Sequence, residues 1–221
     1  MFHSTIGKYN ELCFQGVSLA NIVTSAANEN GGEHVVVASL KALKTCKDLP
    51  ENEAVEMCSK VSDECSKGLA EKMLATQHDG YSILIDAALN DSRPSVFLQT
   101  VKALGALLHG NPDPFDERCF GVILQSLESE SSPETIHAGL ELTLAVCVRH
   151  EQNRQNLMRN KILDLTDKAY QNHPEEVARI WQALVQDDDV RVPYGKAHEN
   201  ARQIVEEHDA QTKLVNSLKG K

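Results

Sequence analysis

Residues 94–104 read PSVFLQTVKAL, and the same pattern returns as PETIHAGLELT at residues 133–143 and as PEEVARIWQAL at residues 174–184. Each stretch opens on a proline, and the three prolines stand 39 and 41 residues apart. Proline fits the first turn of a helix, where its missing N–H costs nothing, so the pattern predicts three long helices. Their apolar positions coincide when the stretches are superposed: Phe97, Val101 and Leu104; Ile136, Leu140 and Thr143; Val177, Trp181 and Leu184.

Shorter helical segments precede each long one. Medium segments with helical apolar spacing open near Tyr81, Phe120 and Ile162, and short first helices are predicted at 71–77 and 151–159. A unit of about 40 residues that holds three helices is typical of armadillo repeats, whereas HEAT units hold two. One such unit cannot bury its own apolar face, so neighbouring units must stack. The sequence therefore predicts an all-α, right-handed armadillo solenoid.

The predicted organisation divides the chain at its breaks in helical pattern, above all at the Gly-rich segment NENGG at residues 28–32. Because the last unit lacks a long third helix, we expect the chain to be an N-terminal fragment of a longer array. The predicted parts are an N-terminal helical segment (1–27), a linker (28–33), a helical capping region (34–68), three armadillo repeats (69–110, 111–150 and 151–187) and a partial repeat (188–221).

Composition excludes several classes of protein. Lys and Arg number 22 against 32 Asp and Glu, a net charge of −10 that disfavours binding to nucleic acid. No stretch approaches the ~18 apolar residues of a membrane span, and the N-terminus does not resemble a signal peptide. The six cysteines form no C-x-x-C pair, so buried free thiols are favoured over disulfides and metal ligands. We therefore expect a reducing location, the cytoplasm or the nucleus, and no membrane partner.

Three further motifs resemble a known family. They are QGVSLANIV at residues 15–23, HEQNRQNL at 150–157 and DDDVRVPYGKAH at 187–198, the last being the most specific. The motifs are similar, in the same order, to the N-terminal part of the armadillo-repeat-containing protein 6 family. The resemblance implies an α-helical repeat protein with no known catalytic activity, whose array continues past Lys221. It implies no particular partner.

One polar stripe on the three long helices is the first candidate site. Third helices line the concave face of such an array, where a polar groove can hold an extended peptide. An ordinary solvated helix face is the alternative. Importin-type armadillo proteins present a Trp and an Asn one turn apart, whereas Val185 follows Trp181 here and Trp181 falls in the core register, which disfavours that mode of peptide binding. From the stripe, the predicted partner-binding residues are Gln99, Lys102, Glu141, Arg179 and Gln182.

A second candidate site is the loop at 187–198. Arg191 would bind a carboxylate and Tyr194 would anchor a partner, with His198 beside them. The structural alternative is that Arg191 pairs with the preceding aspartates and that Pro193 shapes the turn. An inter-repeat junction role, in which side chains tie the loop by hydrogen bonds, is predicted for His150, Asn153, Arg154 and Pro193.

Enzyme chemistry finds little support in the sequence. Cys147 and His150 could share a helix face, but no oxyanion site accompanies them. The nine histidines are dispersed, so no metal site and no cofactor are predicted. The main hypothesis is a non-catalytic, monomeric scaffold for another protein or peptide, with self-association through the uncapped C-terminal edge as a possible addition. The alternatives are a purely structural half of a longer array, with binding in further repeats, and a thiol enzyme or metal protein.

Overall fold

The computed structural model describes residues 33–111, 116–128, 130–148 and 151–185, and every regular element in these ranges is helical. The elements run in the order α3 (Val35–Leu43), the 3₁₀ turn η1 (Cys46–Asp48), α4 (Glu51–Lys67), α5 (Leu69–Gln77), α6 (Gly80–Asn90), α7 (Pro94–Leu108), α8 (Cys119–Ser126), α9 (Pro133–Cys147), α10 (Glu151–Arg159), α11 (Ile162–Ala169) and α12 (Pro174–Val185).

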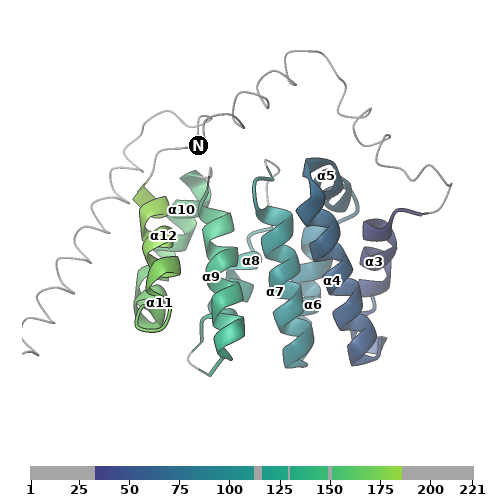
Figure 1. Cartoon of the computed structure of the whole chain (residues 1–221), viewed down its shortest axis with the longest axis horizontal. Coiled ribbons are helices and arrows are strands. Elements are labelled where there is room, and N and C mark those ends of the chain that lie inside the picture. Colours follow the sequence, from purple (N-terminus) through teal and green to yellow (C-terminus); the bar gives the residue numbers. More distant parts are fainter. Residues whose placement is uncertain (1–32, 112–115, 129, 149–150, 186–221) are drawn as a thin grey trace, which may run out of the picture.

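The helices form two stacked layers (Figure 1). The long helices α4, α7, α9 and α12 stand side by side in one layer, each packed on the next. Helices α3, α6, α8 and α11 form the layer behind them, and the short α5 and α10 lie across one end. This arrangement confirms the predicted all-α armadillo solenoid.

The predicted starts of the long helices are confirmed. Helices α7 and α9 begin with proline in the first turn, and α12 begins at Pro174. The Ser132 side chain accepts a hydrogen bond from the Thr135 N–H and so caps α9, as expected for serine before a helix. The short helix α10 spans the predicted residues, and α5 begins two residues before its predicted start at residue 71.

The predicted apolar register is the core. Val101, Leu104, Leu140, Val177 and Leu184 are each fully buried. Thr143 occupies a core position with its hydroxyl satisfied, because that hydroxyl donates to the Gly139 carbonyl one turn earlier at 2.7 Å. Stacking of repeats therefore buries what no single repeat could bury alone.

The region at 34–68 continues the same stack. Its long helix α4 packs on α7 much as α7 packs on α9, while α3 packs on α4 and α6. Pro50 stands immediately before α4, so this helix too follows a proline. The structure thus gives the 34–68 region the medium and long helices of a repeat.

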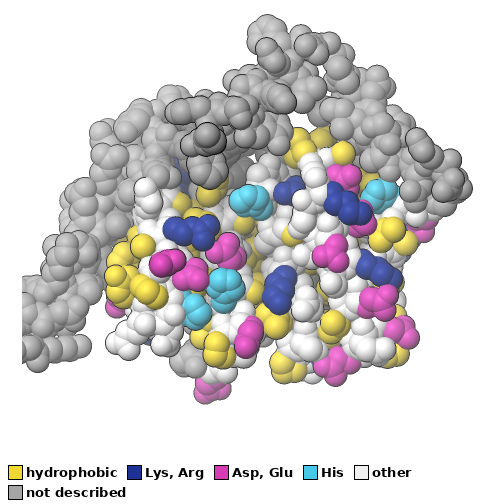
Figure 2. All heavy atoms as spheres, viewed as in Figure 1, with side chains coloured by type: hydrophobic (Ala, Val, Ile, Leu, Met, Phe, Trp, Pro, Cys, Tyr) yellow, Lys and Arg dark blue, Asp and Glu magenta, His cyan; other side chains and the backbone are white. Residues whose placement is uncertain are grey.

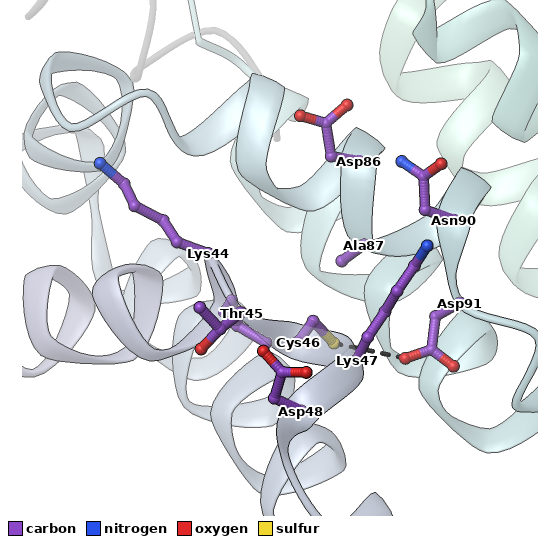
Figure 3. A pocket seen from close by; sticks show the side chains of 10 residues that line it. Lys44, Thr45, Cys46, Lys47, Asp48, Asp86, Ala87, Asn90 and Asp91 are labelled. Atoms are coloured by element: carbon purple, nitrogen blue, oxygen red, sulfur yellow. Dashed lines mark hydrogen bonds between the residues drawn. The ribbon is translucent and has the colours of Figure 1, made fainter.

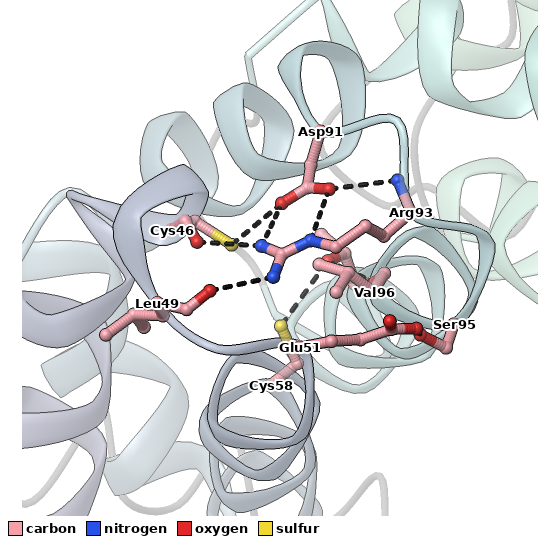
Figure 4. Close-up of polar contacts among 9 residues, drawn as sticks. Cys46, Leu49, Glu51, Cys58, Asp91, Arg93, Ser95 and Val96 are labelled. Atoms are coloured by element: carbon pink, nitrogen blue, oxygen red, sulfur yellow. Dashed lines mark hydrogen bonds and ion pairs between the residues drawn. The ribbon is translucent and has the colours of Figure 1, made fainter.

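An arginine fastens this first unit to the next repeat (Figure 4). Arg93, at the start of α7, donates to the backbone carbonyls of Leu49 and Cys46, both at 2.8 Å. The same guanidinium forms an ion pair with Asp91, whose side chain is almost fully buried. Hydrogen bonds from Arg93 lower the pKa of Asp91 from 3.8 to about 2, which outweighs the raising effect of burial.

The described cysteines are buried free thiols, as predicted for Cys46, Cys58, Cys65, Cys119 and Cys147. Burial raises the pKa of Cys46 to about 11 and that of Cys65 to about 12, so both are protonated at neutral pH. Among the described helices, none combines the length and apolar character needed to cross a bilayer.

Candidate functional site

The predicted polar stripe lies on the solvent-facing side of the long-helix layer, and Figure 2 shows basic, acidic and histidine side chains intermingled over this face. Lys102, Arg179 and Gln182 are exposed, whereas Gln99 and Glu141 are half-buried. Whether they bind a partner stays a prediction.

A groove of about 470 Å³ runs between α7 and α9 on this face. Small residues line it and let a ligand approach the helix backbones: Gly105, Ala106, Ala138 and Ala145. Lys102 and Glu141 also line it, one from each helix, so the groove brings together two of the predicted residues. Gln99, Arg179 and Gln182 lie outside its lining.

Lys72 enters the groove from α5 and was not predicted. Its Nζ donates a hydrogen bond to the backbone carbonyl of His109, at the end of α7. Burial lowers the pKa of Lys72, because a less solvated site disfavours the charged amine. No sequence pattern marks this residue, since it stands 30 positions from Lys102 and outside the long-helix stripe.

Two polar pairs cross from α9 to α12 beside the groove. Arg179 donates to Glu141 at 3.2 Å, and their side chains are 57% and 44% exposed. One turn earlier on α9, His137 Nδ1 lies 3.2 Å from Glu176 Oε1. Arg179 therefore forms an ion pair with the predicted groove residue Glu141, across the boundary between two repeats.

The junction before α10 is architectural in its geometry. Asn153 Nδ2 donates to the Val146 carbonyl and Arg154 Nη1 donates to the Cys147 carbonyl, both at 3.2 Å. Both side chains are buried, Arg154 to 1% exposure. These bonds join α10 to the last turn of α9, and the loop-tying role of these residues stays a prediction. The other predicted residues of the junction and loop lie outside the described residues: His150, Arg191, Pro193, Tyr194 and His198.

Trp181 is turned towards α11. Its Nε1 donates to Thr166 Oγ1 at 2.9 Å, and its ring stacks on Tyr170 with centroids 5.8 Å apart. The indole thus serves the packing between α11 and α12, which agrees with the predicted core position and disfavours the importin mode. Cys147, the residue of the thiol-enzyme alternative, is fully buried and cannot meet a substrate without local unfolding.

A second hollow, of about 420 Å³, lies between η1 and α6 (Figure 3). Side chains of both charges surround it, among them Lys44, Lys47, Asp86 and Asp91. The Asp91 carboxylate is engaged by Cys46 and by Arg93. This hollow therefore lies over the tie between the first two units, and no sequence prediction fell on it.

Comparison with known proteins identifies relatives of this chain. No family profile matches, and no solved structure matches. The Armadillo repeat-containing protein 6 homolog of Drosophila melanogaster is 34% identical over 87% of this chain and 45% of its own length. Armadillo repeat-containing protein 6 of Homo sapiens is 30% identical over 93% of this chain and 44% of its own length.

The chain thus spans less than half the length of these curated relatives. The matched part of the relatives is their N-terminal part. The similarity to armadillo repeat proteins agrees with the observed stack of three-helix units. The chain is therefore similar in sequence to the N-terminal part of armadillo repeat-containing protein 6 from these organisms, and its all-helical stack fits an armadillo repeat protein.

Proposed function

We propose that this chain is a non-catalytic scaffold that binds another protein through the face formed by α4, α7, α9 and α12. The observation that carries the proposal is the groove between α7 and α9, with small residues along it and Lys102 and Glu141 at its sides. Extended peptides bind such surfaces by backbone hydrogen bonds and by charge selection. The armadillo homologues support the general role of a repeat scaffold.

The charges favour a segment with an acidic side chain opposite Lys102. Lys102 is exposed and forms no ion pair within the described ranges, so its charge remains available to a partner. Glu141 is compensated by Arg179, and the Lys72 amine is held by a carbonyl. A carboxylate near Lys102 would gain attraction without displacing an existing pair.

Charge reversal tests this proposal. A Lys102→Glu, Arg179→Glu double variant should lose partners in affinity capture from the lysate of its own cells. A Lys168→Glu variant is the matched control, because Lys168 is exposed on α11 in the other layer. Both variants should keep wild-type helicity, since the changed side chains are exposed.

A third arm separates the groove from the loop that the sequence also suggested. An Arg191→Glu, Tyr194→Ala variant should retain the partners if the groove carries binding. Partners lost only from this loop variant would assign binding to residues 187–198. Identical partner lists for all variants would favour the purely structural alternative, with binding in further repeats. The cytoplasmic or nuclear location stays a proposal, supported by the buried thiols.

A further inference from the structure

A cluster of two histidines and one glutamate bridges the second and third repeats. His137 lies on α9, His173 immediately precedes α12, and Glu176 lies in the first turn of α12. One nitrogen from each histidine and one carboxylate oxygen lie within 4.8 Å of one another. From these residues we propose a binding site for a divalent transition-metal ion of the zinc class.

The donor set suits such an ion. Zinc takes imidazole nitrogen and carboxylate oxygen at about 2.0–2.2 Å, and sites with two His, one Glu and an open fourth position are common. Magnesium and calcium prefer oxygen ligands, so they fit this cluster poorly. The fourth position would be open to water or to a side chain of a partner.

The distances are within reach of a bound ion. Three donors spaced at the full 4.8 Å would surround a point about 2.8 Å from each of them, so each donor would move inward by at most about 0.7 Å to reach bonding distance in their plane. The His137 side chain is 53% exposed and that of Glu176 is 23% exposed, which leaves room for this adjustment.

The backbones that carry the cluster are fixed. The His173 N–H donates to the Ala169 carbonyl at 2.9 Å, and its carbonyl accepts from the Val177 N–H at 3.1 Å. His137 follows the capped start of α9. The rings of His137 and His173 already lie side by side, with centroids 6.1 Å apart. Metal sites gain precision when their ligands stand on rigid elements in this way.

The neighbouring junction lacks these donors. The repeat shifts of 39 and 41 residues carry His137 to Leu98, His173 to Ser132 and Glu176 to Thr135. None of these replacements is an imidazole or a carboxylate, although the helices pack in the same order. The cluster is therefore a feature of the α9–α12 junction and not a consequence of the repeat pattern.

Linear spacing could not predict this cluster. His137 and His173 are separated by most of a repeat, and the sequence analysis expected no metal site because its histidines are dispersed. An ion there would crosslink two repeats at the edge of the groove, which His137 also lines. Binding of the ion to this cluster does not require a partner in the groove.

Zinc titration of the full chain after chelator treatment tests the proposal. A His137→Gln, His173→Gln variant should lose one equivalent of bound Zn²⁺, or bind it at least about tenfold more weakly. A His78→Gln, His109→Gln variant is the matched control, because it removes two exposed histidines outside the cluster and should bind as the wild type does. Zn²⁺, but not Mg²⁺, should raise the melting temperature of the wild type and of the control.

Equal zinc binding by the wild type and both double variants would overturn the proposal. So would the absence of binding at zinc concentrations equal to that of the chain, in which case His137 and Glu176 form a hydrogen bond only. If the cluster variant loses helicity in chelator, the Glu176→Gln variant replaces it, since it keeps the side-chain shape but weakens a ligand. Unchanged zinc affinity in that variant, with helicity retained, would equally contradict the site.

Discussion

Two Asp-x-Arg segments, at 91–93 and 116–118, have the same local geometry in different surroundings. In each, the aspartate accepts from the arginine backbone N–H at 3.0 Å. The arginine Nε also donates to the same carboxylate, at 2.9 Å in the first segment and 2.8 Å in the second. Each arginine stands immediately before a helix, α7 or α8.

What differs is what the guanidinium reaches. Arg93 binds backbone carbonyls of the preceding unit, and the Asp91 side chain is 3% exposed. Arg118 binds the side chains of Asp86 and Ser82 on α6, and the Arg118 and Asp86 side chains are 46% and 54% exposed. Both arginines therefore join neighbouring units, but the first does so through a buried carboxylate and backbone carbonyls and the second through exposed side chains. Exposed ion pairs contribute little to stability, whereas breaking a buried one is costly.

The largest expected effect comes from removing the buried carboxylate. Asp91→Ala should lower the free energy of unfolding by about 2–3 kcal/mol, because it removes charge-assisted hydrogen bonds and leaves Arg93 without its counter-charge. Asp116→Ala is the matched control and should cost less than about 1 kcal/mol, as partly exposed pairs do. Urea unfolding measures both. Equal losses would show that the two segments do not differ as burial implies.

The buried Asp91 carboxylate should also make the stability of the chain depend on pH. The pKa of Asp91 is about 2 in the folded chain against 3.8 ordinarily, because Arg93 stabilises the charged form. A lowered pKa adds stability above about pH 4, and this stability is lost as the pH falls towards 2. Unfolding measured between pH 5 and about pH 2 should therefore be less pH-dependent in Asp91→Asn than in the wild type. An unchanged slope would contradict the anchoring role.

Two glycines on the long helices differ in how closely they are packed. A Cβ on Gly139 would lie 2.8 Å from Ser126 Cβ, whereas one on Gly105 would meet only Leu142 Cα at 3.9 Å. Gly139→Ala should therefore cost about 1–3 kcal/mol, since α8 and α9 must move apart. Gly105→Ala should be neutral or stabilising by up to about 1 kcal/mol, through higher helix propensity. Thermal melting distinguishes them, and equal shifts would refute the close approach of α8 and α9.

The structural features that recur in each repeat could be predicted from the sequence. Pro94, Pro133 and Pro174 predicted where the long helices begin. The repeated apolar positions, such as Val101 and Leu140, predicted the core. Both signals are local, because proline constrains its own turn and helical periodicity repeats within a few residues. The same apolar register predicted which side of the long helices faces solvent.

Features that depend on contact between distant residues were not predictable. Lys72 meets His109, Arg93 meets Leu49, and His137 meets His173, each across more than 30 residues. Nothing in the local pattern marks these residues, since the same types elsewhere in the chain stand on solvated surfaces. Asp91–Arg93 and Asp116–Arg118 have nearly identical local geometry but differ in burial. The burial of such a motif therefore cannot be predicted from its sequence alone.

Site-specific photocrosslinking tests directly whether the long-helix face binds a protein partner. A photoreactive residue at position 102 should crosslink to a segment of the captured partner, and mass spectrometry should identify that segment as one with an acidic side chain. The same residue at position 168, in the opposite layer, should give no such product. Partner crosslinks at 168 and none at 102 would show that the partner does not bind the long-helix face.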